Sequence, residues 1–175
     1  ETGEVIIRRL VTLEDYKDTV EPETWELLLK LADAFRGKKL INISSTPQGG
    51  GVALMRHRLI DLLRLLGIDA HWYIMAGDGK VFEVTKKKMH NVLQGVSFLK
   101  LTESDKELLK KWWRDNFDKR ITGVARDADV IIIDDYQPSG LIELIEKINP
   151  KAKFVYRSHI QIQSQLIKDP PQRDA

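Results

Sequence analysis

The sequence predicts an α/β protein, built as an open, mostly parallel sheet with helices on both of its faces. Strand patterns alternate with helix patterns along the chain, as in sheets whose crossovers are helices. Residues 129–134 form an apolar run between two aspartates, which is typical of a strand buried on both faces. Gly49, Gly50 and Gly51 join an apolar strand pattern to the start of a helix. Together these features indicate a Rossmann-like domain.

Capping signals and apolar periodicity predict the individual elements. A short strand over residues 4–9 leads to a brief helix that begins at Thr12, because Asp15, three residues later, completes a capping box. The next helix begins near Pro22, which suits a first helical turn, and ends before Gly37, which suits a left-handed cap. Apolar periodicity places strands at residues 40–43, 68–75, 129–134 and 153–157, helices at 52–66, 102–122 and 139–148, and a helical insertion at 81–94.

Length, charge and composition exclude several classes of function. A chain of 175 residues fits one domain, here residues 1–175, with a core of its own. The net charge of +2 comes from balanced acids and bases, so no field attracts nucleic acid. No apolar run could span a bilayer and no secretory signal opens the sequence, so we expect a cytosolic parent protein without a membrane partner. Cysteine is absent and the four histidines lack metal-binding spacing, so disulfides and metal sites are not expected.

Three polar motifs follow three different strand patterns. The glycines follow one strand pattern, Asp134 and Asp135 end the apolar run, and His159 comes just after the last strand pattern. The carboxyl ends of parallel strands meet at one edge of a sheet, and ligands bind open α/β sheets there. A helix that starts near Val52 would present free N–H groups to a phosphate or sugar oxygen at this edge. The alternatives are that polar loops close strand ends in any fold and that the glycines form only a tight turn.

Five short segments carry a recognisable pattern. They read T-P-Q-G-G-G-V-A at residues 46–53, F-E-V-T-K at 82–86, H-N-V-L-Q-G at 90–95, D-D-Y-Q-P at 134–138 and Y-R-S-H-I at 156–160. In this order they resemble the N-terminal, acceptor-side half of retaining GT-B glycosyltransferases of the trehalose synthase and trehalose phosphorylase type. Tyr136 departs from the pattern, because the family has a proline there. The sequence ends at Ala175, whereas the family carries a second Rossmann-like domain for the donor.

The resemblance implies glycosyl transfer, with a nucleotide-glucose or phosphate as co-substrate and with no bound cofactor or metal. The implied site residues are Asp135 and Gln137 for sugar hydroxyls, Gly49, Gly50, Gly51 and Val52 for the donor phosphate, Arg157 as a second substrate contact, and His159 near the reacting centre. With half of a two-domain site, the chain is expected to bind sugar and phosphate weakly and to be inactive alone. His159 would then be an ancestral catalytic residue that does not function here.

A Ser–His–Asp hydrolase is a competing catalytic hypothesis, since Ser158, His159 and Asp135 are available. The nucleophile motif G-x-S-x-G is missing, and a serine directly beside its histidine does not easily adopt triad geometry. Arg157 also has an alternative, because an arginine at a strand end is as often a structural ion-pair partner. The residues therefore favour the sugar site over the hydrolase.

The helix predicted at residues 102–122 carries two neighbouring tryptophans. An apolar stripe at four-residue intervals faces the core and consists of Leu109, Trp113, Phe117 and Ile121. Trp112 lies about 100° around the helix from Trp113. It either covers a neighbouring loop or, with Asn116, forms an exposed anchor for a protein partner.

The sequence also permits a second hypothesis, an engineered stand-alone scaffold for a protein partner such as an antibody. The absent donor domain, the lack of cysteine and the aromatic Tyr136 favour it, and Glu1-Thr2-Gly3 is similar to an expression-vector remnant. Such a scaffold would be expressed as a secreted recombinant protein, and an antibody would bind the helix at residues 102–122. The alternative is a natural fragment of an active trehalose synthase or phosphorylase that binds glucose or trehalose and a donor phosphate.

Overall fold

Four parallel strands form the centre of the computed structural model, which describes residues 2–48 and 50–161. The strands are β1 (Lys39–Ser44), β2 (Asp69–Ile74), β3 (Val130–Asp134) and β4 (Lys153–Arg157). Their order across the sheet is β2-β1-β3-β4, and each neighbouring pair is parallel. The predicted α/β class with an open parallel sheet is confirmed.

The strand order reverses direction between β1 and β3. After β1, the helix α3 (Gly50–Leu65) leads the chain to β2 on one side of β1. The chain then returns past β1 to β3, and β4 follows on the far side. Two neighbouring strands whose connections leave in opposite directions open a crevice beyond their carboxyl ends. The fold therefore places its ligand edge where Ser44 and Asp134 end their strands.

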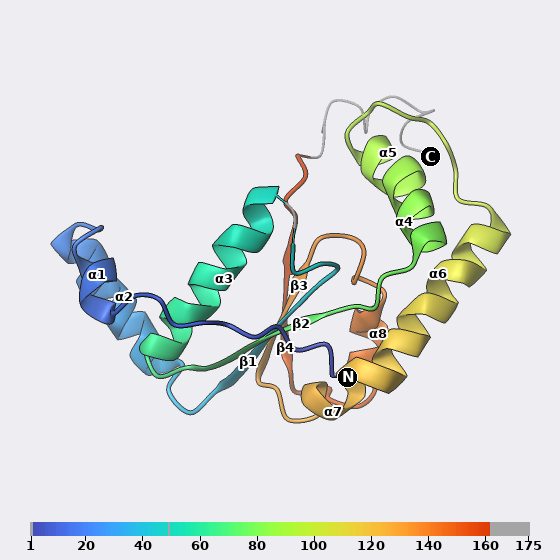
Figure 1. Ribbon diagram of the computed structural model, residues 1–175. Helices are drawn as coiled ribbons and strands as arrows, with labels where there is room; N and C mark the ends of the chain where they lie inside the picture. Colours follow the sequence, from blue (N-terminus) through green and yellow to red (C-terminus); the bar gives the residue numbers. More distant parts are fainter. Residues whose placement is uncertain (1, 49, 162–175) are drawn as a thin grey trace.

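Helices cover both faces of the sheet (Figure 1). On one side lie α1 (Leu13–Lys17), α2 (Pro22–Ala34) and α3, whose apolar side chains pack with those of Leu40, Ala70 and Trp72. On the other side lie α6 (Glu103–Asn116), the π-helical turn η2 (Phe117–Ile121), α7 (Thr122–Ala125) and α8 (Leu141–Glu146). Ile41, Ile43, Ile131 and Ile133 fill this second core and are all fully buried. Alternate residues of β1 and β3 thus point to opposite faces, as pleated strands require.

Local signals fix most element ends where the sequence predicts them. Thr12 caps α1 through a capping box with Asp15, and Thr102 caps α6 in the same way with Asp105. Gly37 follows α2 with a φ of 73°, in the left-handed region that glycine adopts without strain. The insertion predicted at residues 81–94 is α4 (Gly79–Thr85), η1 (Lys86–His90) and α5 (Asn91–Leu93), and Lys88 of η1 contacts the Asp105 carboxylate at 2.5 Å.

The strand predicted at residues 4–9 is wrong. Only Glu4 forms a β-bridge, antiparallel to Tyr73, and backbone hydrogen bonds join Val5 N to Trp72 O and Ile74 N to Gly3 O. Beyond this contact the chain leaves the edge of β2, and Ile6 is 85% exposed. The apolar pattern of residues 4–9 predicts a strand, but it does not show that the chain lies beside the edge of β2 over only three residues.

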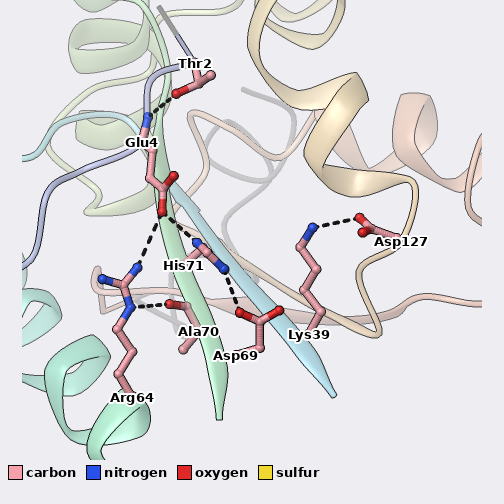
Figure 2. A network of polar contacts seen from close by, with 8 residues as sticks. All are labelled: Thr2, Glu4, Lys39, Arg64, Asp69, Ala70, His71 and Asp127. Carbon is pink, nitrogen blue, oxygen red and sulfur yellow. Dashed lines mark hydrogen bonds and ion pairs between the residues drawn. The ribbon is translucent and has the colours of Figure 1, made fainter. Parts of the chain in front are cut away.

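Hydrogen bonds and an ion pair hold this N-terminal segment, residues 3–5, against the sheet (Figure 2). The Glu4 carboxylate lies 2.6 Å from Nδ1 of His71 and 3.4 Å from the Arg64 guanidinium, and His71 Nε2 lies 2.8 Å from Asp69. Arg64 also donates to the carbonyl oxygen of Ala70 at 2.6 Å. The segment is therefore fixed to both β2 and α3.

No helix among residues 2–48 and 50–161 is long and apolar enough to cross a membrane.

Candidate functional site

A cavity of about 340 Å³ lies beyond the carboxyl ends of β1 and β3, at the point where the strand order reverses. Ser44, Ser45 and Thr46 line it from the end of β1, and Val52, Ala53 and Arg56 line it from α3. The end of β3 contributes Asp134, the loops after β3 and β4 contribute Asp135, Tyr136, Gln137 and His159, and η1 contributes His90. The sequence motifs that follow three separate strands thus meet in one cavity, as the predicted sheet requires.

A buried chain of charged and polar side chains forms one wall of this cavity. Arg56, 1% exposed, pairs through its guanidinium with Oδ2 of Asp134, which is 2% exposed. The other carboxylate oxygen, Oδ1, lies 3.0 Å from Nε2 of His159. A carboxylate can only accept a hydrogen bond, so Nε2 of His159 carries the proton in this arrangement. Burial lowers the pKa of Arg56, and the adjacent Asp134 opposes that effect.

Asp135 adopts an uncommon backbone conformation that directs the loop after β3. Its φ is 66°, in the left-handed region that aspartate tolerates better than most residues. Its N–H donates to the carbonyl oxygen of Arg157 at 2.8 Å, and its Oδ1 accepts the backbone N–H of His159 at 2.8 Å. Asp134 and Asp135 therefore hold His159 together, one through its ring and the other through its backbone.

Gln137, Tyr136 and His90 supply neutral polar groups. The Oε1 atom of Gln137 is buried and has no hydrogen-bond partner within the described part of the chain. Tyr136 is 6% exposed, and burial, assisted by the charge of Asp135, raises the pKa of its hydroxyl to about 12. Burial, followed by nearby Lys86, lowers the pKa of His90, so its imidazole is neutral at neutral pH. This set of hydroxyl, amide, imidazole and carboxylate groups suits the many hydroxyls of a sugar.

Comparison with known proteins identifies the family. Residues 42–173 match the family model described as the N-terminal domain of trehalose synthase. The chain belongs to this family. Among its relatives, the trehalose phosphorylase of Pleurotus pulmonarius is 46% identical over 164 residues, which are 89% of this chain and 22% of the relative. The trehalose synthase of Pyrococcus horikoshii is 40% identical over 152 residues, which are 87% of this chain and 35% of the relative.

Another relative, the trehalose phosphorylase of Grifola frondosa, is 42% identical over 178 aligned positions, 93% of this chain and 23% of its own length. The chain thus spans between 22% and 35% of the length of these relatives. The predicted resemblance to the N-terminal half of trehalose synthases and phosphorylases is confirmed.

The predicted residues of this trehalose synthase-type domain take up different positions around the cavity. Asp135, Gln137 and His159 all line it, as does Val52 in the first turn of α3. Gly49 lies outside the described residues, while Gly50 and Gly51 begin α3. A methyl group on Gly51 would meet no atom within 4 Å, so close packing does not require glycine at that position. Packing is therefore not the reason for a glycine at this position, and the space beside it is free for a ligand.

Arg157 differs from its predicted role. It does not line the cavity, and its carbonyl oxygen accepts the N–H of Asp135. Its charge is close enough to contribute to the lowered pKa of Arg56. Its register position in β4, opposite Asp134, sets this placement, because the loop that follows, rather than the strand end, enters the cavity. Arg157 therefore contributes its backbone carbonyl oxygen, which holds the Asp135 loop, and not its side chain.

The cationic group of the cavity wall is Arg56, which the motifs did not indicate. A signal was present, because Arg56 follows Val52 by four residues and precedes Ile60 by four, on the stripe that α3 turns to the sheet. An arginine in such a stripe needs a buried acid, and Asp134 at the end of an apolar strand was the available one. His90 could not be found this way, since only the folding of η1 against the sheet edge brings it to the cavity.

The partner surface predicted at Trp112 and Asn116 is not present in that form. Asn116 is 2% exposed, and its amide accepts from Ala76 N at 2.6 Å and donates to Trp112 O at 2.9 Å. The indole of Trp112 is partly buried and donates to Ala76 O at 2.8 Å. These groups fasten α6 to the segment after β2, so the polar atoms of both side chains already have partners within the chain.

The described residues form neither a metal site nor a Ser–His–Asp triad. No cluster of histidine, aspartate or glutamate residues within ranges 2–48 and 50–161 could hold a metal ion. The Ser158 hydroxyl donates to the carbonyl oxygen of Ile160 at 2.9 Å, whereas the ring of His159 contacts Asp134. The serine is therefore directed away from a charge-relay arrangement, and the hydrolase hypothesis loses its geometric basis.

Proposed function

We propose that this domain is one half of a GT-B glycosyltransferase site, which holds a sugar ring during the synthesis or cleavage of trehalose. The observation that carries the proposal is the cavity at the switch point, where Asp135, Gln137 and His159 converge with the first turn of α3. The relatives are named trehalose phosphorylases and trehalose synthases, and we take trehalose as the sugar from these names. Asp135 and Gln137 hydrogen-bond its hydroxyls, and His159 lies beside the reacting carbon.

The start of α3 is the proposed site for the phosphate of the co-substrate, either free phosphate or a nucleotide-glucose. The first-turn N–H groups of a helix have no partner within the helix and lie at the positive end of its dipole. In α3 the first turn contains Gly50, Gly51 and Val52, and it carries no acidic side chain. The Arg56 cation lies one turn further on, although Asp134 already offsets its charge. The backbone is therefore the main anion-binding element.

A binding titration tests the proposal directly. The amide resonances of Gly51, Val52 and Asp135 should move when trehalose, glucose or phosphate is added, whereas that of Gly37, at the amino end of β1, should not. We expect millimolar dissociation constants, worth about 4 kcal/mol, because half of a two-domain pocket contributes half of the contacts. Stationary amides at high millimolar concentrations of all three ligands would rule the proposed function out.

The 175-residue chain by itself should not transfer glucose. Closure of a second domain over the first supplies both the positioning of the donor and the exclusion of water. Incubation with a nucleotide-glucose and glucose should therefore yield no trehalose, and incubation with trehalose and phosphate no glucose phosphate. Product above a protein-free control would show that this half carries the whole catalytic site.

An engineered scaffold for an antibody has no support from the comparisons, in which trehalose phosphorylases and synthases match between 85% and 93% of the chain. The helix surface on which that hypothesis depended is also engaged internally, through Trp112 and Asn116. The natural fragment that binds sugar and phosphate is therefore the function we propose.

A further inference from the structure

A groove of about 480 Å³ lies between α6 and α8, two helices on the face of the sheet away from α3 (Figure 1). Its apolar lining comes from Trp113, Gly140 and Leu144. The Trp113 ring lies directly against the backbone of Gly140, because a Cβ at that position would overlap it. The groove shares no lining residue with the cavity beyond β1 and β3, so it is a separate place on the domain.

Positive charge predominates around this groove. Lys110 and Arg114 line it from α6, and Lys147, which follows α8, lines it from the other helix. Among the described residues that line it, Glu143 alone is acidic. The three cationic side chains are exposed, so a ligand can reach them from solvent.

The cations of the groove differ from the other cations of α6 in their pairing. Lys106 pairs with Glu103 at 2.7 Å, and Lys111 pairs with Asp115 at 2.5 Å, so these two charges are balanced within the helix. Within ranges 2–48 and 50–161, none of the three cations that line the groove has an ion-pair partner. The helix therefore balances the positive charges that point elsewhere and leaves those at the groove unbalanced.

Two of the unbalanced charges also repel each other. Lys110 and Arg114 are four residues apart on α6, a spacing at which like charges are neighbours on a helix surface and destabilise it. An anion placed between them would replace this repulsion by attraction. The guanidinium of Arg114 can in addition donate two parallel hydrogen bonds to a phosphate or carboxylate group.

The size and lining of the groove indicate the class of anion. Its volume lies in the range of roughly 300–1,000 Å³ that small-molecule sites occupy. An inorganic ion would leave Trp113 and Leu144 uncovered, and a neutral apolar molecule would leave the cations unpaired. A nucleic acid needs a basic stripe along its backbone, whereas the net charge of the chain is only +2. The lining therefore suits an organic anion with an apolar body.

We propose that the groove between α6 and α8 binds a small organic anion that carries two or more negative charges on an apolar body. Phosphate esters and polycarboxylates share this chemistry. The charges lie among Lys110, Arg114 and Lys147, and the apolar body lies against Trp113 and Leu144. The site does not depend on the proposed function, because the cavity beyond β1 and β3 contributes none of these residues.

The indole N–H resonances of the 175-residue chain test the proposal. Trp113 lines the groove, Trp72 lines the cavity beyond β1 and β3, and Trp25 in α2 lines neither. Phenyl phosphate and trimesate, an aromatic tricarboxylate, represent the two kinds of anion. At low ionic strength we expect Trp113 to move with a dissociation constant on the order of 1 mM, and inorganic phosphate to bind more weakly. Trp25 should stay still.

Each outcome of this titration has one meaning. Movement of Trp113 with phenyl phosphate but not with trimesate would identify a phosphate site, and the reverse would identify a carboxylate site. If Trp113 stays still at high millimolar concentrations of both, or if only Trp72 moves, the proposal is wrong. An acidic peptide that binds more tightly than either small anion would assign the groove to a protein partner and would also overturn the proposal.

A matched pair of double variants tests the role of the unpaired cations. Lys110→Gln/Arg114→Gln removes two charges from the groove, so we expect affinity for phenyl phosphate to fall about fivefold or more. Lys106→Gln/Lys111→Gln removes two charges from the same helix outside the groove, so its affinity should change less than about twofold. All four side chains are exposed, so both variants should keep the fold. Equal losses in the two variants would reduce the effect to overall charge and exclude a site.

Glu143 provides a test with the opposite sign. Glu143→Gln removes the acidic group from the lining, so we expect affinity for phenyl phosphate to rise about twofold. Unchanged or weaker binding in this variant would contradict an anion bound in the groove.

Discussion

Two opposite charges lie side by side in the wall of the cavity beyond β1 and β3, with almost no access to water. Arg56 and Asp134 are each about 2% exposed or less in their side chains, and Asp134 also holds His159. Such a pair is stabilised only while both members are present, because a single buried charge lacks compensation. Asp134 therefore links two roles: it stabilises the domain by pairing with Arg56, and it positions the ring of His159.

Replacing Arg56 tests this coupling. Arg56→Met should lower the free energy of unfolding by about 3–5 kcal/mol, because it leaves the Asp134 carboxylate buried and unpaired. Denaturant unfolding measures the loss. In Arg56→Met/Asp134→Asn the charge is removed from both sides, so we expect the double variant to be more stable than the single one. Additive losses would show that the two side chains do not act as a pair.

Two substitutions at Asp135 separate the effect of backbone strain from the effect on sugar binding. Its φ of 66° suits glycine, so Asp135→Gly should keep the free energy of unfolding within about 1 kcal/mol while removing the carboxylate and weakening trehalose binding. Asp135→Val should instead lose about 1–3 kcal/mol, because a β-branched side chain is strained at positive φ. Parallel denaturation and titration of the two variants decide the matter. A valine variant as stable as the glycine variant would contradict the conformational role.

The sequence indicates Asp135, Gln137 and His159 because each follows a strand of one parallel sheet, and strand ends converge by geometry alone. It does not indicate that Arg157 would turn its backbone to the site and leave its side chain outside. It also misses His90, which depends on how a helical insertion packs. Residues whose position follows from one element are thus predictable, and residues whose position follows from contacts between elements are not.

Two elements of the second helical layer meet at a single glycine. Any Cβ at Gly140, just before α8, would overlap the ring of Trp113 on α6. The same ring donates its N–H to the carbonyl oxygen of Gln137 at 2.6 Å. Trp113 therefore packs against the start of α8 and fixes the backbone of the loop that carries Gln137.

Gly140→Ala should cost about 1–3 kcal/mol of stability, the range for overpacking a core. In a Trp113→Ala background the added methyl group has space, so we expect the same change to cost much less. Thermal or denaturant unfolding of the four proteins in this cycle gives the coupling energy. A coupling near zero would mean that α6 and α8 do not meet through this pair.

At the scale of the elements, local sequence signals determine where the helices begin and end, whereas contacts between elements determine the partners of their side chains. Thr12 and Thr102 begin their helices by capping, and Gly37 follows the end of α2 in the left-handed conformation, which the sequence shows directly. The stripe on α6 predicted different roles for Trp112 and Trp113, but both indoles donate to backbone carbonyl oxygens of other segments. Helix periodicity predicts the direction in which a side chain points, but which residue it contacts depends on how the other elements pack.

At the scale of the whole molecule, buried tyrosines make the domain sensitive to alkali. Burial raises the pKa of Tyr73, near Glu4, and of Tyr136, near Asp135, to about 12 from an ordinary value of 10.0. The folded state therefore holds these protons more tightly than the unfolded state. Their contribution is complete below pH 10 and is lost as the pH rises through about 12.

The free energy of unfolding should accordingly fall between about pH 10 and about pH 12. Tyr136→Phe should show a smaller fall than the parent protein, because one of the two tyrosines whose pKa is raised to about 12 is gone. Denaturation curves at several alkaline pH values, with tyrosinate absorbance followed in parallel, measure both effects. Ionisation of all four tyrosines at their ordinary pKa in the folded protein would contradict the prediction.

The segment of residues 3–5 gives the two borders of the sheet different properties. Its two backbone hydrogen bonds occupy the outward groups at Trp72 and Ile74, near the end of β2, and Glu4 holds the segment there through His71 and Arg64. An occupied border cannot serve as a template for a foreign strand, which is how natural sheets avoid aggregation. β4 has no such cover within the described residues, and its Val155 and Tyr156 are 48% and 50% exposed. Within the described residues, a strand added to this sheet would therefore find fewer occupied backbone groups beside β4 than beside the end of β2.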